Sequence, residues 1–247
     1  MTPPSSVDPA ATAVAETKAL NFKVRGFLFE LRELDGRLCL RAPHLAGYGA
    51  ISADWGSEDV RRRIKGGKKQ LLAKAVGLHK HPSPHVLDGT AGLGRDGYTL
   101  AALGANVTLV ERTHALVRLL RDAQARALSD ATLCAAADRI TVIEASSHAL
   151  LTSSASEGAA WDVIYLDPMY PEDGKSALPS KEMQVLRDLT GGDADADSLL
   201  DLALACARQR VVIKRPAKAP WLAGRKPGLE LKGTQARFDI YLPSPRP

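Results

Sequence analysis

The stretch His85-Val-Leu-Asp-Gly-Thr-Ala-Gly-Leu-Gly-Arg-Asp-Gly97 decides the fold, because a short apolar run leads directly into a glycine-rich loop. The residues that follow, through Tyr98, Leu100 and Leu103, have helical spacing. Glycines at a strand-to-helix turn let the backbone approach a ligand closely, and the helix N-terminus offers free N–H groups. The stretch therefore predicts the first strand and the ligand-binding loop of a Rossmann-like α/β domain.

Four further apolar runs continue this alternation of strand and helix. They are residues 107–111, 140–144, 161–167 and 210–214, and stretches of helical period separate them, including residues 114–127 and 199–208. Short β-branched runs between helices predict a mostly parallel sheet that is covered on both faces. Residues 229–242 contain two alternating segments without a helix, so we expect an antiparallel hairpin to close the sheet.

The N-terminal part follows a different pattern. Apolar positions alternate on both sides of Asp35-Gly36, and this predicts a β-hairpin, because glycine accepts the positive φ of a tight turn. A helix is expected over residues 68–76, and the acidic stretch 191–197 is expected as an exposed loop. We therefore expect a flexible leader (1–20), a small β-hairpin subdomain (21–60) and a Rossmann-like domain (61–247).

Composition narrows the class of protein. The chain has 247 residues, of which 45% are hydrophobic and 25% charged, and this excludes a disordered chain. No apolar run approaches the roughly 20 residues of a membrane span, and the N-terminus lacks the features of a secretory signal. Cys39, Cys134 and Cys206 form no Cys-x-x-Cys pair, so we expect a cytosolic protein with reduced thiols.

The net charge of +5 hides two basic stretches, residues 61–80 and 210–237. The first contains eight Lys and Arg residues and no acid. Such clusters attract polyanions because they neutralise phosphates and release counterions. A solvated lysine-rich helix face is the alternative interpretation.

Two carboxylates bear on the choice of cofactor, and one of them favours S-adenosylmethionine over a nicotinamide cofactor. Asp88 stands at the tip of the first strand, where an anion attracts a sulfonium and repels a pyrophosphate. Glu111 ends the second strand and can accept both hydroxyls of a ribose, which suits either cofactor. A nicotinamide-dependent oxidoreductase would rest only on the pattern Gly-x-Gly-x-x-Gly at residues 92–97.

The fourth strand ends in Asp167-Pro-Met-Tyr-Pro171. An exocyclic amine on a planar base is a poor nucleophile, because its lone pair is delocalised into the ring. The Asp167 side chain and the Pro168 carbonyl can accept its N–H groups, while the Tyr170 ring offers a face for stacking. The segment predicts amino-group methylation with these three residues as the catalytic set. A proline-terminated strand with a core tyrosine is the structural alternative.

These segments, together with Lys65-Gly-Gly67, Leu72-Ala-Lys-Ala-Val-Gly77, Glu111-Arg112 and Val212-Ile-Lys-Arg-Pro216, resemble the ribosomal RNA small subunit methyltransferase J family. The resemblance extends from about residue 22 to the C-terminus. It implies a Rossmann-like class I S-adenosylmethionine-dependent methyltransferase that acts on the N2 amine of a guanosine in 16S rRNA of the small ribosomal subunit. Met169 replaces the second proline of the broader amino-methyltransferase pattern, and the family accepts this residue.

The resemblance implies cofactor contacts from Arg95, Asp96, Glu111, Arg112, Ser146, Ser147 and Asp167. The glycine loop adds Asp88, Gly89, Gly92 and Gly94 as candidates. Capping of the helix that follows is the structural alternative for Ser146 and Ser147, and it is compatible with ligand contact. The candidate RNA contacts are Arg61, Arg62, Arg63, Lys65, Lys68, Lys69, Lys214 and Arg215. For Lys214 and Arg215, a structural salt bridge is the alternative.

Other functions remain open at this point. Methylation of a protein side-chain amide fits the same chemistry, because that nitrogen is also planar and weakly nucleophilic. A non-catalytic rRNA-binding assembly factor is the alternative outside enzymes. No metal is expected, because Pro82 and Pro84 interrupt the cluster of His79, His81 and His85, and methyl transfer needs none.

Overall fold

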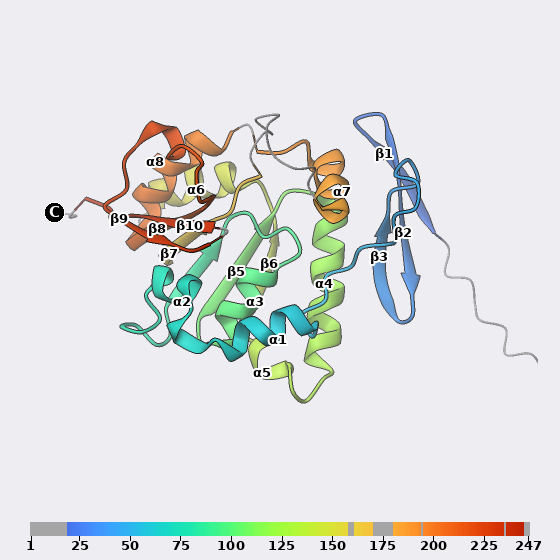
Figure 1. Cartoon of the computed structure of the whole chain (residues 1–247), viewed down its shortest axis with the longest axis horizontal. Helices are drawn as coiled ribbons and strands as arrows, with labels where there is room; N and C mark the ends of the chain where they lie inside the picture. The colour runs from blue at the N-terminus through green and yellow to red at the C-terminus, as the bar shows by residue number, and fades with distance from the viewer. Residues whose placement is uncertain (1–18, 158–160, 170–179, 194, 235, 245–247) are drawn as a thin grey trace, which may run out of the picture.

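A seven-stranded sheet of order β6-β5-β4-β7-β8-β10-β9 forms the centre of the computed structural model (Figure 1). The structure describes residues 19–157, 161–169, 180–193, 195–234 and 236–244. The strands are β4 His85–Asp88, β5 Asn106–Glu111, β6 Ile140–Glu144, β7 Trp161–Leu166, β8 Ala207–Pro216, β9 Leu229–Lys232 and β10 Ala236–Tyr241. Strands β4 to β8 are parallel, whereas β10 runs antiparallel to β8 and β9. The predicted α/β fold with a C-terminal antiparallel hairpin is confirmed.

Helices cover both faces of this sheet. The elements are α1 Glu58–Lys65, α2 Leu71–Val76, α3 Arg95–Ala102, α4 His114–Leu128, α5 Cys134–Ala137, α6 Ser147–Glu157, α7 Lys181–Thr190 and α8 Ala196–Cys206. Two hydrophobic cores result, one under α2, α3 and α4 and the other under α6 and α8. Neighbouring residues alternate between them: Val86 packs in the first core and Leu87 in the second. This double burial explains why the parallel strands are continuous apolar runs.

The N-terminal sheet has three antiparallel strands, β1 Leu20–Val24, β2 Phe27–Leu34 and β3 Arg37–Arg41. The predicted turn is confirmed, because Asp35 and Gly36 have φ values of 50° and 70°. The first hairpin was not predicted; its turn at Arg25-Gly26 also has positive φ at both residues. This sheet stands beside α4 and α7 (Figure 1).

Two helix expectations differ from the structure. The helix expected over residues 68–76 is divided into a 3-10 turn, Gly67–Lys69, and α2, because Gln70 between them is extended with a ψ of 157°. Helix α1 was not expected; the Ser57 hydroxyl caps it by accepting from the Val60 N–H. In the part of the chain that is described, no helix has the length and apolar character needed to cross a membrane.

Candidate active site

The carboxyl ends of the parallel strands surround a cavity of about 1010 Å³. Segments that follow β4, β5, β6, β7 and β8 all contribute to its wall, and α7 adds residues from the side. The cavity opens where β4 lies between β5 and β7, the point at which the strand order reverses. Ligands of open α/β sheets bind at this topological switch point.

The glycine loop after β4 is shaped both by backbone conformation and by close packing. Gly92 has a φ of +54°, and a side chain added there would meet no heavy atom within 4 Å. At Gly97 an added Cβ would lie 2.3 Å from Leu109, and at Gly94 it would lie 2.7 Å from Leu120. The backbone at Gly92 therefore borders open space, which suits a ligand that packs against the loop, whereas Gly94 and Gly97 are required by packing.

Asp88, the last residue of β4, contacts the glycine loop that follows it. Its side chain is buried, and its Oδ1 accepts a hydrogen bond of 3.2 Å from the Thr90 N–H. Burial, aided by the nearby Asp96 carboxylate, raises the pKa of Asp88 to about 8. The hydrogen bond from Thr90 fits the role expected of Asp88 in organising the loop. A pKa of about 8 favours the neutral carboxyl at pH 7, which differs from the anion expected from the sequence.

Glu111, at the end of β5, joins the loop to the next strand. Its Oε2 accepts from the Gly92 N–H at 3.1 Å and its Oε1 from the Thr113 N–H at 2.7 Å. Burial raises the pKa of Glu111, while these N–H groups act in the opposite direction.

Ser147 is the first residue of α6, and its hydroxyl donates to the Gly89 carbonyl. Glu111, Ser146 and Ser147 all line the cavity.

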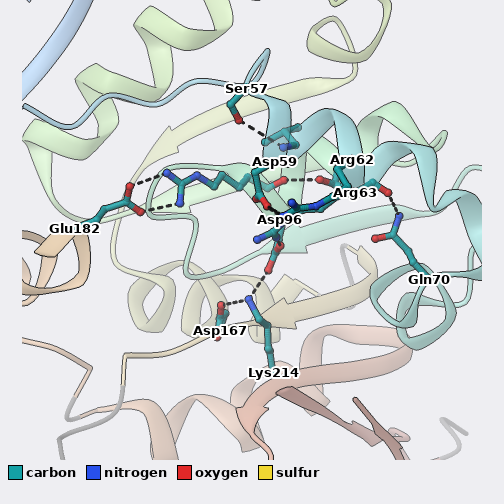
Figure 2. A network of polar contacts seen from close by, with 12 residues as sticks. Ser57, Asp59, Arg62, Arg63, Gln70, Asp96, Asp167, Glu182 and Lys214 are labelled. Atoms are coloured by element: carbon teal, nitrogen blue, oxygen red, sulfur yellow. Dashed lines mark hydrogen bonds and ion pairs between the residues drawn. The ribbon is translucent and has the colours of Figure 1, made fainter. Parts of the chain in front are cut away.

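Figure 2 shows a network of charges that joins the glycine loop to the tip of β7. The Lys214 ammonium lies 2.7 Å from Asp167 Oδ2 and 2.9 Å from Asp96 Oδ2. The Tyr165 hydroxyl donates to Asp96 Oδ2 at 2.6 Å, and Arg63 pairs with Asp96 Oδ1 at 2.7 Å. One ammonium is thus shared by two carboxylates from different segments of the chain.

This sharing divides the charge unequally between the two acids. Burial raises the pKa of Asp167, and the attraction of Lys214 only partly offsets it. For Asp96 burial acts in the same direction, but Lys214, Tyr165 and Arg63 outweigh it and lower the pKa. Burial opposes the charge on Lys214, yet its two carboxylate partners raise its pKa. Asp96 is therefore the more firmly ionised acid of the pair.

Both predicted cofactor arginines are anchored by salt bridges. The Arg95 guanidinium meets Glu182 of α7 through two hydrogen bonds of 2.7 Å. Arg112 lies 2.8 Å from Asp193 and 3.2 Å from Asp195. These bridges hold α7 and the segment before α8 against the cavity.

The expectation of an exposed loop at residues 191–197 is wrong at Asp193. Its side chain is only 16% exposed, and its Oδ2 accepts from the Met169 N–H at 2.7 Å. A return bond runs from the Asp193 N–H to the Met169 carbonyl at 3.1 Å. The segment therefore supports the turn after β7.

The candidate RNA contacts divide into two groups. Arg61, Arg62, Lys65, Lys68 and Lys69 are exposed. Arg63 is bound to Asp96 and Asp59, and Lys214 forms the salt bridge that was its alternative interpretation. Arg215 lines the strand-end cavity but is only 3% exposed and donates to the Pro220 carbonyl, so its role as an RNA contact stays a prediction.

Several residues of the site were not anticipated. Thr90 accepts from the Asp167 N–H at 2.6 Å, so it fixes the backbone at the tip of β7. Tyr165 lies within an apolar strand, and that pattern gives no sign that its hydroxyl takes part in the site. Glu182 and Asp193 lie far from the glycine loop in the sequence. Tyr170 falls outside the described residues. Among the described residues no three His, Cys, Asp or Glu side chains are grouped to hold a metal ion.

Comparisons with known proteins identify the family of this chain. A family described as "Putative SAM-dependent methyltransferase" matches residues 18–243. A ribosomal RNA small subunit methyltransferase J of Pseudomonas paraeruginosa is 48% identical over 195 residues, covering 78% of this chain and 74% of the relative. The protein of that name from Vibrio vulnificus is 47% identical over 221 residues, covering 86% of this chain and 82% of the relative.

A crystal structure of a SAM-dependent methyltransferase from Neisseria gonorrhoeae superposes with a TM-score of 0.66 at 34% identity. The match covers 86% of this chain and 81% of that one. The sequence relatives and the structural match therefore extend over most of this chain. The chain belongs to the ribosomal RNA small subunit methyltransferase J family and is an S-adenosylmethionine-dependent methyltransferase.

Proposed function

We propose that this enzyme methylates the exocyclic N2 amine of a guanosine in 16S rRNA of the small ribosomal subunit. The observation that carries the proposal is the position of Asp167 and Pro168, which face the same cavity as the glycine loop and Glu111. The relatives named above are ribosomal RNA small subunit methyltransferases, which supports a ribosomal RNA substrate. A ribosomal substrate in turn supports a cytoplasmic location.

The cavity contains suitable groups for the cofactor. The open space at Gly92 suits close approach of a ligand, and Glu111 retains acceptor capacity for a ribose beyond its two backbone bonds. When bound, S-adenosylmethionine supplies a methyl group on a sulfonium that is a good leaving group. The residues proposed to hold it are Asp88, Gly89, Gly92, Arg95, Asp96, Glu111, Arg112, Ser146, Ser147 and Asp167, with Gly94 shaping the loop through packing.

Asp167 and Pro168 are proposed to orient the target amine. Lys214 occupies Asp167 Oδ2, and no donor among the described residues is bound to Oδ1. The Oδ1 atom and the Pro168 carbonyl can therefore accept the two N–H groups of the amine. These bonds localise the nitrogen lone pair and direct it toward the methyl carbon, so positioning supplies much of the rate. Tyr170 is proposed to stack on the base.

The proton that the amine loses can pass to Asp167. Burial raises the pKa of this carboxyl above its usual value and makes it a better base. Thr90 holds the backbone of Asp167, and Lys214 holds its side chain. We expect these two positioning residues to affect the rate through Asp167 rather than through contact with the substrate.

The test is transfer of a labelled methyl group from S-adenosylmethionine to small ribosomal subunits that lack this modification. We expect digestion of the RNA to nucleosides to yield labelled N2-methylguanosine. Label in RNA on another nucleoside would overturn the assignment of the amine. Label that resists ribonuclease and is released by protease would instead identify a protein amide as the acceptor.

A further inference from the structure

A second hollow, of about 600 Å³, lies between α2 and the β9–β10 hairpin. It is separate from the strand-end cavity, because none of its lining residues also lines that cavity. Strand β9 is the edge strand of the sheet, and α2 packs against both β9 and β10. The methyl-transfer chemistry described above uses no residue of this hollow, which we call the edge groove.

The floor of the edge groove is apolar. Leu231 and Ile240 form its inner part, and Leu229 and Leu242 extend it outward. Leu229 is 54% exposed and Leu242 is 66% exposed, which places two large apolar side chains in contact with water. Exposed apolar surface that lies within a hollow indicates a binding site rather than an ordinary surface position.

The rim of the edge groove is cationic. Lys68, Lys69, Lys74 and Lys80 line it, and all four are exposed. Among the described residues, no acidic side chain lines the groove. A cluster of ammonium groups with no carboxylate in the groove lining produces a field that attracts phosphates.

Arg210 strengthens this argument because part of its guanidinium is buried without compensation. Its Nη1 donates to the Ala75 carbonyl at 3.2 Å, whereas its buried Nε has no partner among the described residues. A buried donor without an acceptor costs free energy. The Arg210 guanidinium also lines the edge groove, so it adds a fifth cation to the four lysines.

One segment connects the edge groove to the proposed catalytic cavity. Arg63 of α1 lines the cavity, and Lys68 lines the edge groove. Five residues of chain span at most about 18 Å, which corresponds to roughly five stacked nucleotides at about 3.4 Å each. A single RNA strand of about five nucleotides is therefore long enough to reach from one hollow to the other.

We infer that the edge groove binds the ribosomal RNA beside the target nucleotide, with phosphates on its lysines and a base or ribose on its apolar floor. The inference rests on the proposed function, since it concerns the same RNA. It adds Lys74, Lys80, Arg210 and the four apolar floor residues to the surface that recognises the substrate. Contacts of this kind position the RNA and carry no sequence information by themselves.

The test compares two charge-reversal variants of equal net charge. Lys74→Glu/Lys80→Glu changes the edge groove, and Arg121→Glu/Arg139→Glu changes exposed cations beside β6, at the opposite edge of the sheet. The probe is protein-free 16S rRNA from subunits that lack the methyl group, and affinity is measured between 50 and 200 mM salt. Raising the salt weakens RNA binding by the unaltered protein. For Lys74→Glu/Lys80→Glu, which loses two phosphate contacts, we expect this salt-induced loss of affinity to be about tenfold smaller.

A third variant, Leu229→Ser/Leu242→Ser, tests the floor. We expect weaker RNA binding with an unchanged salt dependence, because no phosphate contact is lost. Calorimetric binding of S-adenosylmethionine at unaltered affinity shows that each variant is folded. The inference is overturned if the edge-groove variants bind RNA like the Arg121/Arg139 control, or if they lose affinity only for intact subunits, which would indicate a ribosomal protein.

The two proposals fail in distinguishable ways. If the unaltered enzyme methylates subunits and the edge-groove variants do so with unchanged KM, only the edge-groove inference is wrong. If the unaltered enzyme binds RNA through the edge groove but transfers no methyl group to it, the proposed function is wrong.

Discussion

Lys214 Nζ lies 2.7 Å from Asp167 Oδ2, and the same ammonium lies 2.9 Å from Asp96 Oδ2. Asp96 belongs to the first turn of α3, Asp167 follows β7, and Lys214 is part of β8. The ion pairs therefore join the glycine loop, the proposed catalytic turn and the neighbouring strand. Because the site is partly buried, these pairs are screened less than surface salt bridges.

Replacing Asp167 with Ala tests the proposed role of its carboxylate. Without the acceptor, the amine loses both its orientation and a base, and we expect kcat to fall by about 10² to 10⁴. The measurement is labelled methyl transfer at saturating S-adenosylmethionine and RNA. Asp201→Ala, at a side chain 87% exposed on α8, is the matched control and should retain the full rate. An Asp167→Ala enzyme that folds normally and keeps its kcat would exclude the proposed mechanism.

Replacing Lys214 with Gln should change the pH dependence of the reaction. The ammonium lowers the pKa of Asp167, so its removal raises that pKa further. Asp167 then becomes ionised only at higher pH, so the acid limb of the plot of kcat against pH should shift to higher pH. A Lys214→Arg variant keeps the charge and should restore much of the original profile. A uniform loss of rate at every pH would instead indicate a purely structural role.

Gly97→Ala should destabilise the protein although alanine favours helices. The added Cβ would lie 2.3 Å from Leu109 and 3.2 Å from the buried Asp88 carboxyl. Overpacking of this kind costs about 1 to 3 kcal/mol, more than the gain of about 0.5 to 1 kcal/mol from removing a helical glycine. Urea unfolding measures the difference. Gly49→Ala, where an added Cβ meets nothing within 4 Å, should be close to neutral.

Much of the fold was predictable because its signals are local. Each parallel strand is buried on both faces and is therefore an apolar run, and the turn at Asp35-Gly36 uses residues that accept positive φ. The missed hairpin at Arg25-Gly26 shows the limit of such signals. There an arginine occupies a positive φ of 53°, a conformation that its side chain does not favour.

Site residues were predictable only where they lie together in one short stretch of sequence. The loop after β4 and the turn after β7 have recognisable patterns, and the structure brings them to one cavity. Long-range partners left no signal: the bond from Asp193 to the Met169 N–H joins residues 24 positions apart, and the Arg95–Glu182 pair joins residues 87 apart. Arg215 lies beside the cavity as expected, but its burial depends on tertiary packing, which local charge does not reveal.

The Arg95–Glu182 pair is predicted to fasten α7 to the glycine loop. Both side chains are partly exposed, so we expect their ion pair to contribute little to stability. A double-mutant cycle of Arg95→Ala and Glu182→Ala, measured as free energies of unfolding, should give a coupling energy of about 0.5 to 1 kcal/mol. Calorimetry should also show weaker binding of S-adenosylmethionine to Glu182→Ala, because the loop is less restrained. Asp188→Ala, on the same helix but paired with His44, provides the control. Equal cofactor affinity in both variants would contradict the proposed link between α7 and the loop.

Asp88→Asn should alter how the stability of the protein depends on pH. The carboxyl has a pKa of about 8 in the folded protein against an ordinary value of 3.8, so the folded state holds its proton more tightly than the unfolded chain does. The stabilisation is complete below the ordinary value and is lost as the pH rises through about 8, at about 1.4 kcal/mol per pH unit. Asn has nearly the same shape and cannot ionise, so the variant should lose less stability between pH 5 and pH 9.

Urea unfolding of both proteins at pH 5, 7 and 9 measures this difference directly. Other groups titrate over the same range, but they are common to both proteins and cancel in the comparison. Asp138→Asn, at an exposed position, should follow the unaltered protein at every pH. Parallel stability curves for Asp88→Asn and the unaltered protein would mean that Asp88 is already ionised at neutral pH. It would then present a standing negative charge to a sulfonium ligand, as its place at the end of β4 first suggested.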